Sequence, residues 1–300
     1  MRALITGSAG FVGTALSEHL RSEGDEVVSL DRATGVDITD RTALFTAVAE
    51  SEADVVYHLA AQAHVPTAWD DPYGTLHCNV EGTMNVLNAA HEAEVPRVIV
   101  ASSADVYGTI DPDLLPVKET TTPRPNNPYA ASKLAAEAFA IQSFYGRNQE
   151  VVCLRAFNQF GPGQRPDFVC AGFAHQIARA EHTNDTKIEV GRLDVRRDFS
   201  DVRDVARAYR LAALHGRPGA IYNVCSGVDR SIEEVGLGLA AMSSADIRFV
   251  QREDLLRPVD TPVVRGDASA ITADTGWTPE IPFATTLEDV LADARRKIAQ

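Results

Sequence analysis

The chain has 300 residues, which is enough for one large domain or two unequal ones with a sizeable core. Its 28 basic and 42 acidic residues give a formal charge of −14, which argues against a nucleic-acid backbone as partner. No apolar run approaches the roughly 20 residues that a membrane-spanning helix needs, and the first residues lack the apolar segment of a signal peptide. We therefore expect no nucleic-acid or membrane partner and a cytoplasmic location.

The cysteines are scattered along the chain, without a CxxC pair and without a histidine at metal-ligand spacing. This pattern predicts reduced structural thiols and no metal site. The residues are Cys78, Cys153, Cys170 and Cys225.

In the first half of the chain, short apolar runs rich in Val, Ile and Leu alternate with helical patterns. The alternation predicts an α/β fold with a doubly wound parallel sheet that helices cover on both faces. We expect strands at residues 2–7, 26–31, 53–61, 97–104 and 150–158, and helices at 10–24, 40–52, 75–93 and 129–145.

After residue 163 the alternation weakens, and the segments predict a smaller, partly interleaved second domain with a cleft between the two. Helices are expected at 172–182, 202–216, 231–242 and 287–298, a strand and turn at 187–199, and a strand at 220–227 that rejoins the large sheet. The expected domains are 1–163, to which 202–227 return, and 164–300.

Three glycines stand between the first predicted strand and the first predicted helix, in the stretch TGSAGFVG. Gly7, Gly10 and Gly13 let a backbone approach a pyrophosphate closely, and the N-terminus of the helix offers its N–H groups to the negative charge. A strand–turn–helix junction often needs glycine in any case, but the position of the motif in the chain favours dinucleotide binding.

The second predicted strand ends in Asp31, 18 residues after Gly13 and close to the offset at which an acid binds the adenosine ribose. Asp31 favours NAD(H), because a carboxylate repels a 2′-phosphate. Arg32 next to it fits that phosphate, so NADP(H) remains possible. Asp37 and Ile38 lie where an adenine ring would rest against the following loop.

Tyr129 and Lys133 lie four residues apart in the alanine-rich stretch PYAASKLAAEAF, so they share one face of a predicted helix. A phenol has a pKa of about 10. We expect Lys133 and the positive ring of an oxidised nicotinamide to lower the pKa of Tyr129, which makes it a proton relay for carbonyl–alcohol chemistry. Ser103, at the end of the fourth predicted strand, is placed to bind the same substrate oxygen.

Taken together, the motifs resemble those of the extended short-chain dehydrogenase/reductases, the NAD-dependent epimerase/dehydratase family. The motifs that carry the resemblance are TGSAGFVG, HLAA, SSADVYG, YAASK and RAFNQFGPGQ, in the family's order and across essentially the whole chain. The resemblance implies an NAD(P)-binding Rossmann domain, catalytic Ser103, Tyr129 and Lys133, and a nucleotide-sugar substrate. It also implies a homodimer in which the helices that hold Thr75 and Tyr129 form a four-helix bundle.

The resemblance further implies which residues contact the ligands. Additional cofactor contacts are expected at Phe11, Val12, Leu59, Ala60, Ala61, Asn79, Ser102 and Phe157. Substrate contacts are expected at Asn158, Val190, Arg197 and Arg257, of which the two arginines match the family's diphosphate-binding positions.

The C-terminal stretches resemble the GDP-sugar branch of the family, and most closely its GDP-4-keto-6-deoxy-mannose reductases. A 4,6-dehydratase also needs an acid/base carboxylate beside the tyrosine, usually a Glu with an adjacent acid. Here Ala104 and Asp105 occupy those places, and Asp105 is one methylene shorter than Glu. We rank reductase first, dehydratase second and 4-epimerase third, and keep Asp105 as a candidate catalytic residue.

A function of a different class is a non-catalytic protein that senses NAD(P), because the same fold also occurs in regulators. The complete set of Ser103, Tyr129 and Lys133 argues against it.

Overall fold

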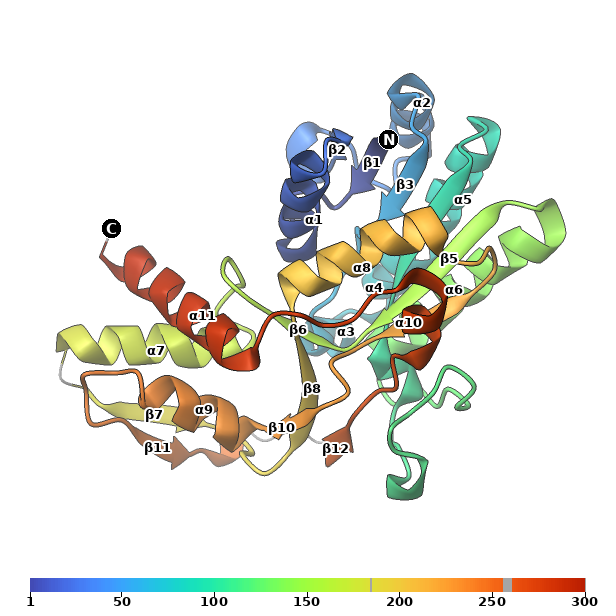
Figure 1. Cartoon of the computed structure of the whole chain (residues 1–300). Helices are drawn as coiled ribbons and strands as arrows, with labels where there is room; N and C mark the ends of the chain where they lie inside the picture. Colours follow the sequence, from blue (N-terminus) through green and yellow to red (C-terminus); the bar gives the residue numbers. More distant parts are fainter. Residues whose placement is uncertain (184, 256–260, 300) are drawn as a thin grey trace.

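Figure 1 shows the computed structural model of the chain, which describes every residue except 184, 256–260 and 300. Its large sheet has six strands in the order β2-β1-β3-β4-β5-β9, and all neighbouring strands are parallel. The strands are β1 Arg2–Thr6, β2 Glu26–Leu30, β3 Val55–His58, β4 Arg97–Ser103, β5 Glu150–Ala156 and β9 Ile221–Val224. The predicted α/β fold with a parallel sheet is confirmed, as is the return of the strand near residue 221 to this sheet.

Helices cover both faces of the large sheet, so its strands are buried on both sides. Ile5 and Tyr57 pack into one apolar cluster with helices α1 and α8, whereas Leu4 and Val56 pack into a second cluster with α2 and α5. This two-sided burial explains why the strands read as continuous apolar runs. The helices are α1 Phe11–Ser22, α2 Arg41–Ser51, α5 Gly82–Glu92, α6 Pro128–Arg147 and α8 Val202–His215.

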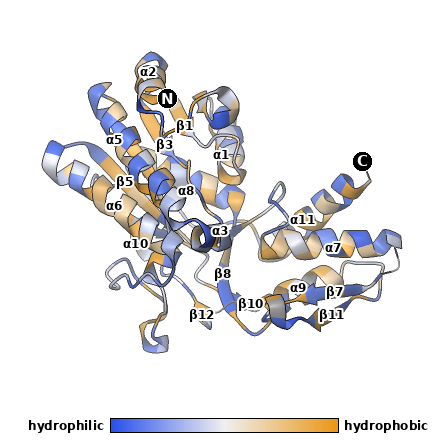
Figure 2. Cartoon of the chain, turned by 180° about the vertical axis from the view of Figure 1, so that it is seen from behind, coloured by the Kyte–Doolittle hydropathy of each residue, from blue (hydrophilic) through white to orange (hydrophobic). Residues whose placement is uncertain are grey.

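The smaller part of the molecule is built around β8, which lies beside β6, β10 and β12. In Figure 2 much of β8 is hydrophilic, in contrast to the apolar strands of the large sheet. A separate pair, β7 and β11, runs parallel. The strands are β6 Asn158–Phe160, β7 Lys187–Val190, β8 Arg196–Asp201, β10 Asp229–Ser231, β11 Arg248–Gln251 and β12 Val263–Val264, and the helices are α7 Val169–Thr183, α9 Ile232–Ala240 and α11 Phe283–Ile298.

The two parts are joined directly at Asp201, where β8 ends and α8 begins. Its carboxylate accepts a hydrogen bond from the backbone N–H of Arg203, at 2.7 Å, and so caps α8. The other carboxylate oxygen accepts from the hydroxyl of Thr286 on α11, also at 2.7 Å. One buried side chain therefore connects β8, the returning helix α8 and the C-terminal helix α11.

The helix predicted at 75–93 starts earlier and is interrupted. It consists of α4 (Pro72–Leu76), a π-helical turn at His77–Glu81, and α5. A π-helical turn inside a helix often marks a functional site, and this one carries Asn79.

Several short elements were not predicted, because they are too few residues long to show a hydrophobic period. They are α3 Val65–Asp70, α10 Ser269–Thr275, β6, β10, β11, β12, and the 3-10 turns η1 Arg32–Thr34, η3 Ala104–Tyr107, η4 Pro112–Leu114 and η5 Glu253–Leu255. Helix α10 places Ile271 in the same apolar cluster as α8, and Trp277, just after it, joins them. Part of the C-terminal segment thus packs on the large sheet.

Candidate active site

The glycine loop forms a cradle that has no room for side chains. Gly7 has a φ of +72°, and a Cβ on it would lie 2.7 Å from the backbone nitrogen of Ala60. A Cβ on Gly13 would lie 2.2 Å from the carbonyl oxygen of Gly7. Gly10 caps α1 without a side-chain hydrogen bond, which leaves the N-terminal N–H groups of this helix facing the loop. This cradle fits the pyrophosphate of a dinucleotide.

Asp31 is held beside the glycine loop. Its carboxylate accepts hydrogen bonds from the backbone N–H of Ala33, at 3.0 Å, and from that of Ala9 in the loop, at 3.4 Å. Thr34 completes a capping box with it. The carboxylate is thereby fixed at the end of β2, where an adenosine ribose would lie, and Arg32 is next to it.

Asp37 and Ile38 are mostly engaged within the protein. The Asp37 carboxylate accepts hydrogen bonds from the backbone N–H and the hydroxyl of Thr39, and these bonds lower its pKa. Ile38 is buried against Gly82 of α5, so its side chain packs the segment that follows β2 onto this helix.

The end of β3 is fixed by a buried histidine. His58 makes hydrogen bonds to the hydroxyl of Thr6 at 2.8 Å and to that of Thr83 at 2.9 Å. Burial, and secondarily the charge of Lys133, lowers the pKa of His58 to about 3, so the ring is neutral at physiological pH. His58 thus anchors the segment of Leu59, Ala60 and Ala61 that lines the glycine cradle.

Asn79 uses its carboxamide within the protein. Its oxygen accepts from the backbone N–H of Gln62 at 2.7 Å, and its nitrogen donates to the carbonyl of Gln62 and to the hydroxyl of Ser132, both at 2.9 Å. Through these hydrogen bonds Asn79 ties the loop after β3 to α6, and the expected contact with a cofactor stays a prediction. The sequence did not reveal Gln62 and Ser132, because these partners are defined only by the fold.

Ser103 and Tyr129 are brought together as expected. Asn127 caps α6 and Pro128 occupies its first turn, so Tyr129 starts the helix at the carboxyl end of β4. Ser103 lies close enough to the Tyr129 phenol to lower its pKa, and the Ser103 Oγ accepts a hydrogen bond from the backbone N–H of Asp105 at 3.1 Å. Lys133 lies one helical turn further along and is 7% exposed.

The pKa of Tyr129 differs from expectation. Burial and the negative charge of Asp105 raise it, and the nearby Ser103 hydroxyl offsets this only in part. Burial also lowers the pKa of Lys133, to about 8. The protein alone therefore keeps the phenol protonated.

Two of the predicted cofactor residues turn their side chains into the protein. The Ser102 hydroxyl donates to the carboxylate of Glu137 at 2.8 Å. Phe157 is buried beside Tyr107, with their ring centroids 6.4 Å apart. The expected cofactor contacts of Ser102 and Phe157 stay predictions. Of the loop residues, Phe11 approaches Gly161, and Val12 packs on the core of the large sheet.

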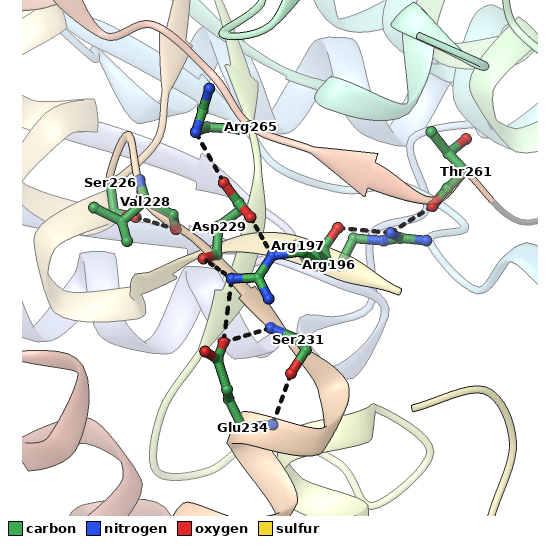
Figure 3. Close-up of polar contacts among 9 residues, drawn as sticks. All are labelled: Arg196, Arg197, Ser226, Val228, Asp229, Ser231, Glu234, Thr261 and Arg265. Atoms are coloured by element: carbon green, nitrogen blue, oxygen red, sulfur yellow. Dashed lines mark hydrogen bonds and ion pairs between the residues drawn. The ribbon is translucent and has the colours of Figure 1, made fainter. Parts of the chain in front are cut away.

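The four predicted substrate residues lie in different surroundings. Asn158 is exposed at the start of β6. Arg197 on β8 donates from one nitrogen to the carbonyls of Arg196, at 2.8 Å, and Thr261, at 2.7 Å, as Figure 3 shows. Val190 is buried in the apolar cluster of the smaller part, and its expected substrate contact stays a prediction. The predicted phosphate ligand Arg257 lies outside the described residues.

Next to Arg197, the ion-paired residues Arg196, Asp229 and Arg265 form a cluster that the sequence did not reveal. In Figure 3, Asp229 lies between two guanidinium groups, those of Arg196 and Arg265. Arg265 approaches it at 3.2 Å. The three residues come from β8, β10 and the end of β12, so only the pairing of these short strands brings them together.

A pocket of about 310 Å³ is lined by residues from Tyr107 to Arg124, and by none of Ser103, Tyr129 and Lys133. We therefore do not assign it to the substrate. Within the part of the chain that the structure describes, no three His, Cys, Asp or Glu side chains gather closely enough to hold a metal ion. Over the same residues, the helices lack the combination of length and apolar character that crossing a membrane requires.

A Rossmann-type sheet with a glycine cradle and a Ser–Tyr–Lys set defines an oxidoreductase of the short-chain dehydrogenase/reductase type. More specifically, residues 3–225 match the model of the NAD dependent epimerase/dehydratase family, and the chain belongs to this family. The family predicted from the motifs is confirmed.

The chain is 38% identical over 301 residues to the GDP-6-deoxy-D-mannose reductase of Pseudomonas aeruginosa, covering 100% of this chain and 99% of that relative. The solved structure of RMD from Pseudomonas aeruginosa complexed with NADPH has a TM-score of 0.92 at 37% identity, covering 99% of this chain and 100% of that one. The UDP-glucose 4-epimerase of Thermus thermophilus in complex with NAD has a TM-score of 0.88 at 29% identity, covering 98% and 99%.

Replacing Gly13 by alanine tests the cradle. The new Cβ would lie 2.2 Å from the Gly7 carbonyl oxygen, so the loop must shift away from α1. We expect NADPH affinity, measured by quenching of protein fluorescence, to fall at least about tenfold. The exposed neighbour Thr14→Ala is the control and should bind normally. Unchanged affinity in Gly13→Ala would contradict the assignment of the cradle.

The lowered pKa of Lys133 predicts a pH dependence of stability. Between the folded pKa of about 8 and the unfolded value of about 10.4, the unfolded chain binds more protons at this lysine. The free energy of unfolding therefore rises with pH across this window. In urea titrations without cofactor, wild type should gain roughly 3 kcal/mol over Lys133→Met from about pH 7.5 to about pH 10.5. Parallel pH curves for the two proteins would contradict the burial of an ionisable lysine here.

Proposed function

We propose that the chain reduces the C4 keto group of a GDP-4-keto-6-deoxy-hexose at the expense of NAD(P)H. The observation that carries this proposal is the full-length likeness, at 38% identity, to a GDP-6-deoxy-D-mannose reductase, combined with the Ser103–Tyr129 contact. The predicted division into a cofactor-binding unit of residues 1–163 with 202–227 and a substrate unit of residues 164–300 belongs to this proposal, although Ile271 and Trp277 pack with the large sheet.

The chemistry needs a hydride and a proton, and a bound reduced nicotinamide supplies the hydride to C4. Tyr129 donates the proton to the oxygen that becomes an alkoxide. The Ser103 hydroxyl hydrogen-bonds the same oxygen and orients it. The Lys133 ammonium, one turn along α6, then stabilises the phenolate that Tyr129 becomes.

The raised pKa of Tyr129 suits this direction of proton transfer. A reductase needs its phenol protonated before the reaction, and both burial and Asp105 keep it so. In this proposal Asp105 keeps the phenol of Tyr129 protonated by its negative charge. The reduction requires no carboxylate base. This role of Asp105 differs from that of the glutamate in a dehydratase.

The 4,6-dehydratase remains the second candidate, because GDP-mannose 4,6-dehydratase of Vibrio cholerae is also a relative, at 25% identity. Against it, Ala104 is buried and offers no acid, and Asp105 is the single carboxylate of the turn at 104–107. A 4-epimerase ranks third. A non-catalytic sensor of NAD(P) is disfavoured by the assembled Ser103, Tyr129 and Lys133.

For the nucleotide diphosphate, we propose Arg197 together with Arg257, and Asn158 for the sugar or nucleotide. A guanidinium suits the bidentate recognition of phosphate oxygens. Arg197 is braced by two backbone carbonyls, which presets its direction.

For the cofactor, we propose that Asp31 favours NAD(H) through the ribose hydroxyls and that Arg32 also admits NADP(H). Support for the first is the carboxylate fixed beside the loop. Support for the second is the exposure of Arg32 and the NADPH bound to the Pseudomonas structure.

We also propose a cytoplasmic homodimer that pairs through the helices containing Thr75 and Tyr129. Helices α3, α4 and α6 pack on one another and expose large apolar side chains. Tyr73 is 86% exposed, Trp69 57% and Leu76 56%. Such a group of exposed apolar residues is typical of a protein interface.

The function is tested with GDP-4-keto-6-deoxy-mannose and either NADH or NADPH, by following absorbance at about 340 nm, the band of the reduced nicotinamide. Wild type should oxidise the cofactor, and Tyr129→Phe should lower kcat by at least about a thousandfold while cofactor binding persists, because the proton donor is lost. Tyr145→Phe, an exposed tyrosine of the same helix, is the matched control.

Failure of wild type to oxidise either cofactor would contradict the reductase. Formation of a 4-keto-6-deoxy product from GDP-mannose alone would establish the dehydratase in its place.

The dimer is tested by Tyr73→Arg combined with Leu76→Arg, which places two charges on the apolar face. We expect light scattering after gel filtration to change from a dimer mass to the 32.4 kDa monomer. Leu237→Arg, on the exposed face of α9, should stay dimeric. A wild-type protein that is monomeric at tens of micromolar would rule out this interface.

A further inference from the structure

Helix α6 carries a third polar residue on the face of the catalytic pair. Tyr129, Lys133 and Glu137 follow one another at intervals of four, so they line up along one side of the helix. Glu137 is 3% exposed. A buried carboxylate in this position has no place in the proton transfer itself, so its contacts decide what it does.

The Glu137 carboxylate receives three hydrogen bonds. Arg155 on β5 donates to both oxygens, from Nε at 2.9 Å and from Nη2 at 2.5 Å. Ser102 on β4 donates to one of them at 2.8 Å. Side-chain exposure is 4% for both partners of the ion pair. Burying two charges is costly unless their geometry is good, and this bidentate geometry satisfies both.

Arg155 extends the contact to the far end of the catalytic turn. Its Nη1 donates to the hydroxyl of Tyr107 at 3.0 Å, and its guanidinium lies over the Tyr107 ring at 4.9 Å. The Tyr107 hydroxyl in turn donates to Asn223 on β9 at 2.7 Å. The turn at 104–107 is therefore held at both ends, by Ser102 before it and by Tyr107 at its close.

We propose that Glu137 is a positioning residue for the reduction, which fixes helix α6 against the turn at 104–107 so that Tyr129 meets Ser103. This inference rests on the proposed function for its kinetic readout. An apolar pair of equal volume in place of Glu137 and Arg155 would fill the same space. It would not fix the orientation of α6 relative to β5, as the two parallel hydrogen bonds of a bidentate ion pair do.

The test separates the link to the active site from the stability of the ion pair. Ser102→Ala removes one hydrogen bond and leaves Glu137 and Arg155 paired. Glu137→Gln keeps an acceptor for Ser102 and removes the charge. In both variants we expect kcat to fall about tenfold or more, because small displacements of a proton donor slow its step. The dissociation constant for NADPH should stay within about twofold of wild type.

Two readouts distinguish positioning from simple loss of structure. The primary deuterium isotope effect on kcat, measured with NADPH deuterated at the transferred position, should rise in both variants as the chemical step becomes limiting. Amide exchange measured by mass spectrometry should accelerate in peptides covering 102–108 and 128–137. A control is Arg210→Met, which breaks a partly buried contact away from the site, the 2.7 Å hydrogen bond of Arg210 Nε to Asp25. It should lower the melting temperature without changing kcat or the isotope effect.

If Ser102→Ala and Glu137→Gln lower only the melting temperature, like Arg210→Met, the positioning role is wrong. If wild type itself lacks reductase activity, the proposed function fails, and the exchange measurement still decides the inference. Unchanged exchange at 102–108 would then overturn it, and faster exchange would support it.

Discussion

The proposed chemistry depends on one arrangement, the placing of the Tyr129 phenol beside the Ser103 hydroxyl. The two residues come from different elements, the start of α6 and the end of β4, and each is placed by its own local rules. Asn127 and Pro128 begin the helix, and the parallel strand β4 ends at Ser103. The arrangement exists because both elements end at the edge of the sheet where open α/β folds bind ligands.

Around this pair the protein controls charge mainly by burial. His58 is kept neutral, the pKa of Lys133 is lowered to about 8, and that of Tyr129 is raised. Burial disfavours the charged form of each group, so the pKa falls for the bases and rises for the phenol. The site therefore starts with a protonated acid, which is the state a reduction consumes.

Much of this could be predicted from the sequence, because the large elements have clear periods. The strands of the main sheet, the glycine loop and the pairing of Tyr129 with Lys133 follow from local patterns. The shifted pKa of Tyr129 and the internal use of Asn79 could not be predicted, since they depend on partners such as Asp105, Gln62 and Ser132 that only the fold brings near. The cluster around Asp229 was missed because β10 and β12 are three and two residues long.

The direct passage from β8 into α8 at Asp201 has a mechanical consequence. Arg197, on β8, stands four residues before this carboxylate, and no loop separates the strand from a helix packed on the main sheet. The Asp201 side chain also holds Thr286 of the last helix. The position of Arg197 is therefore tied to that of α8 through four residues of one strand, without an intervening loop.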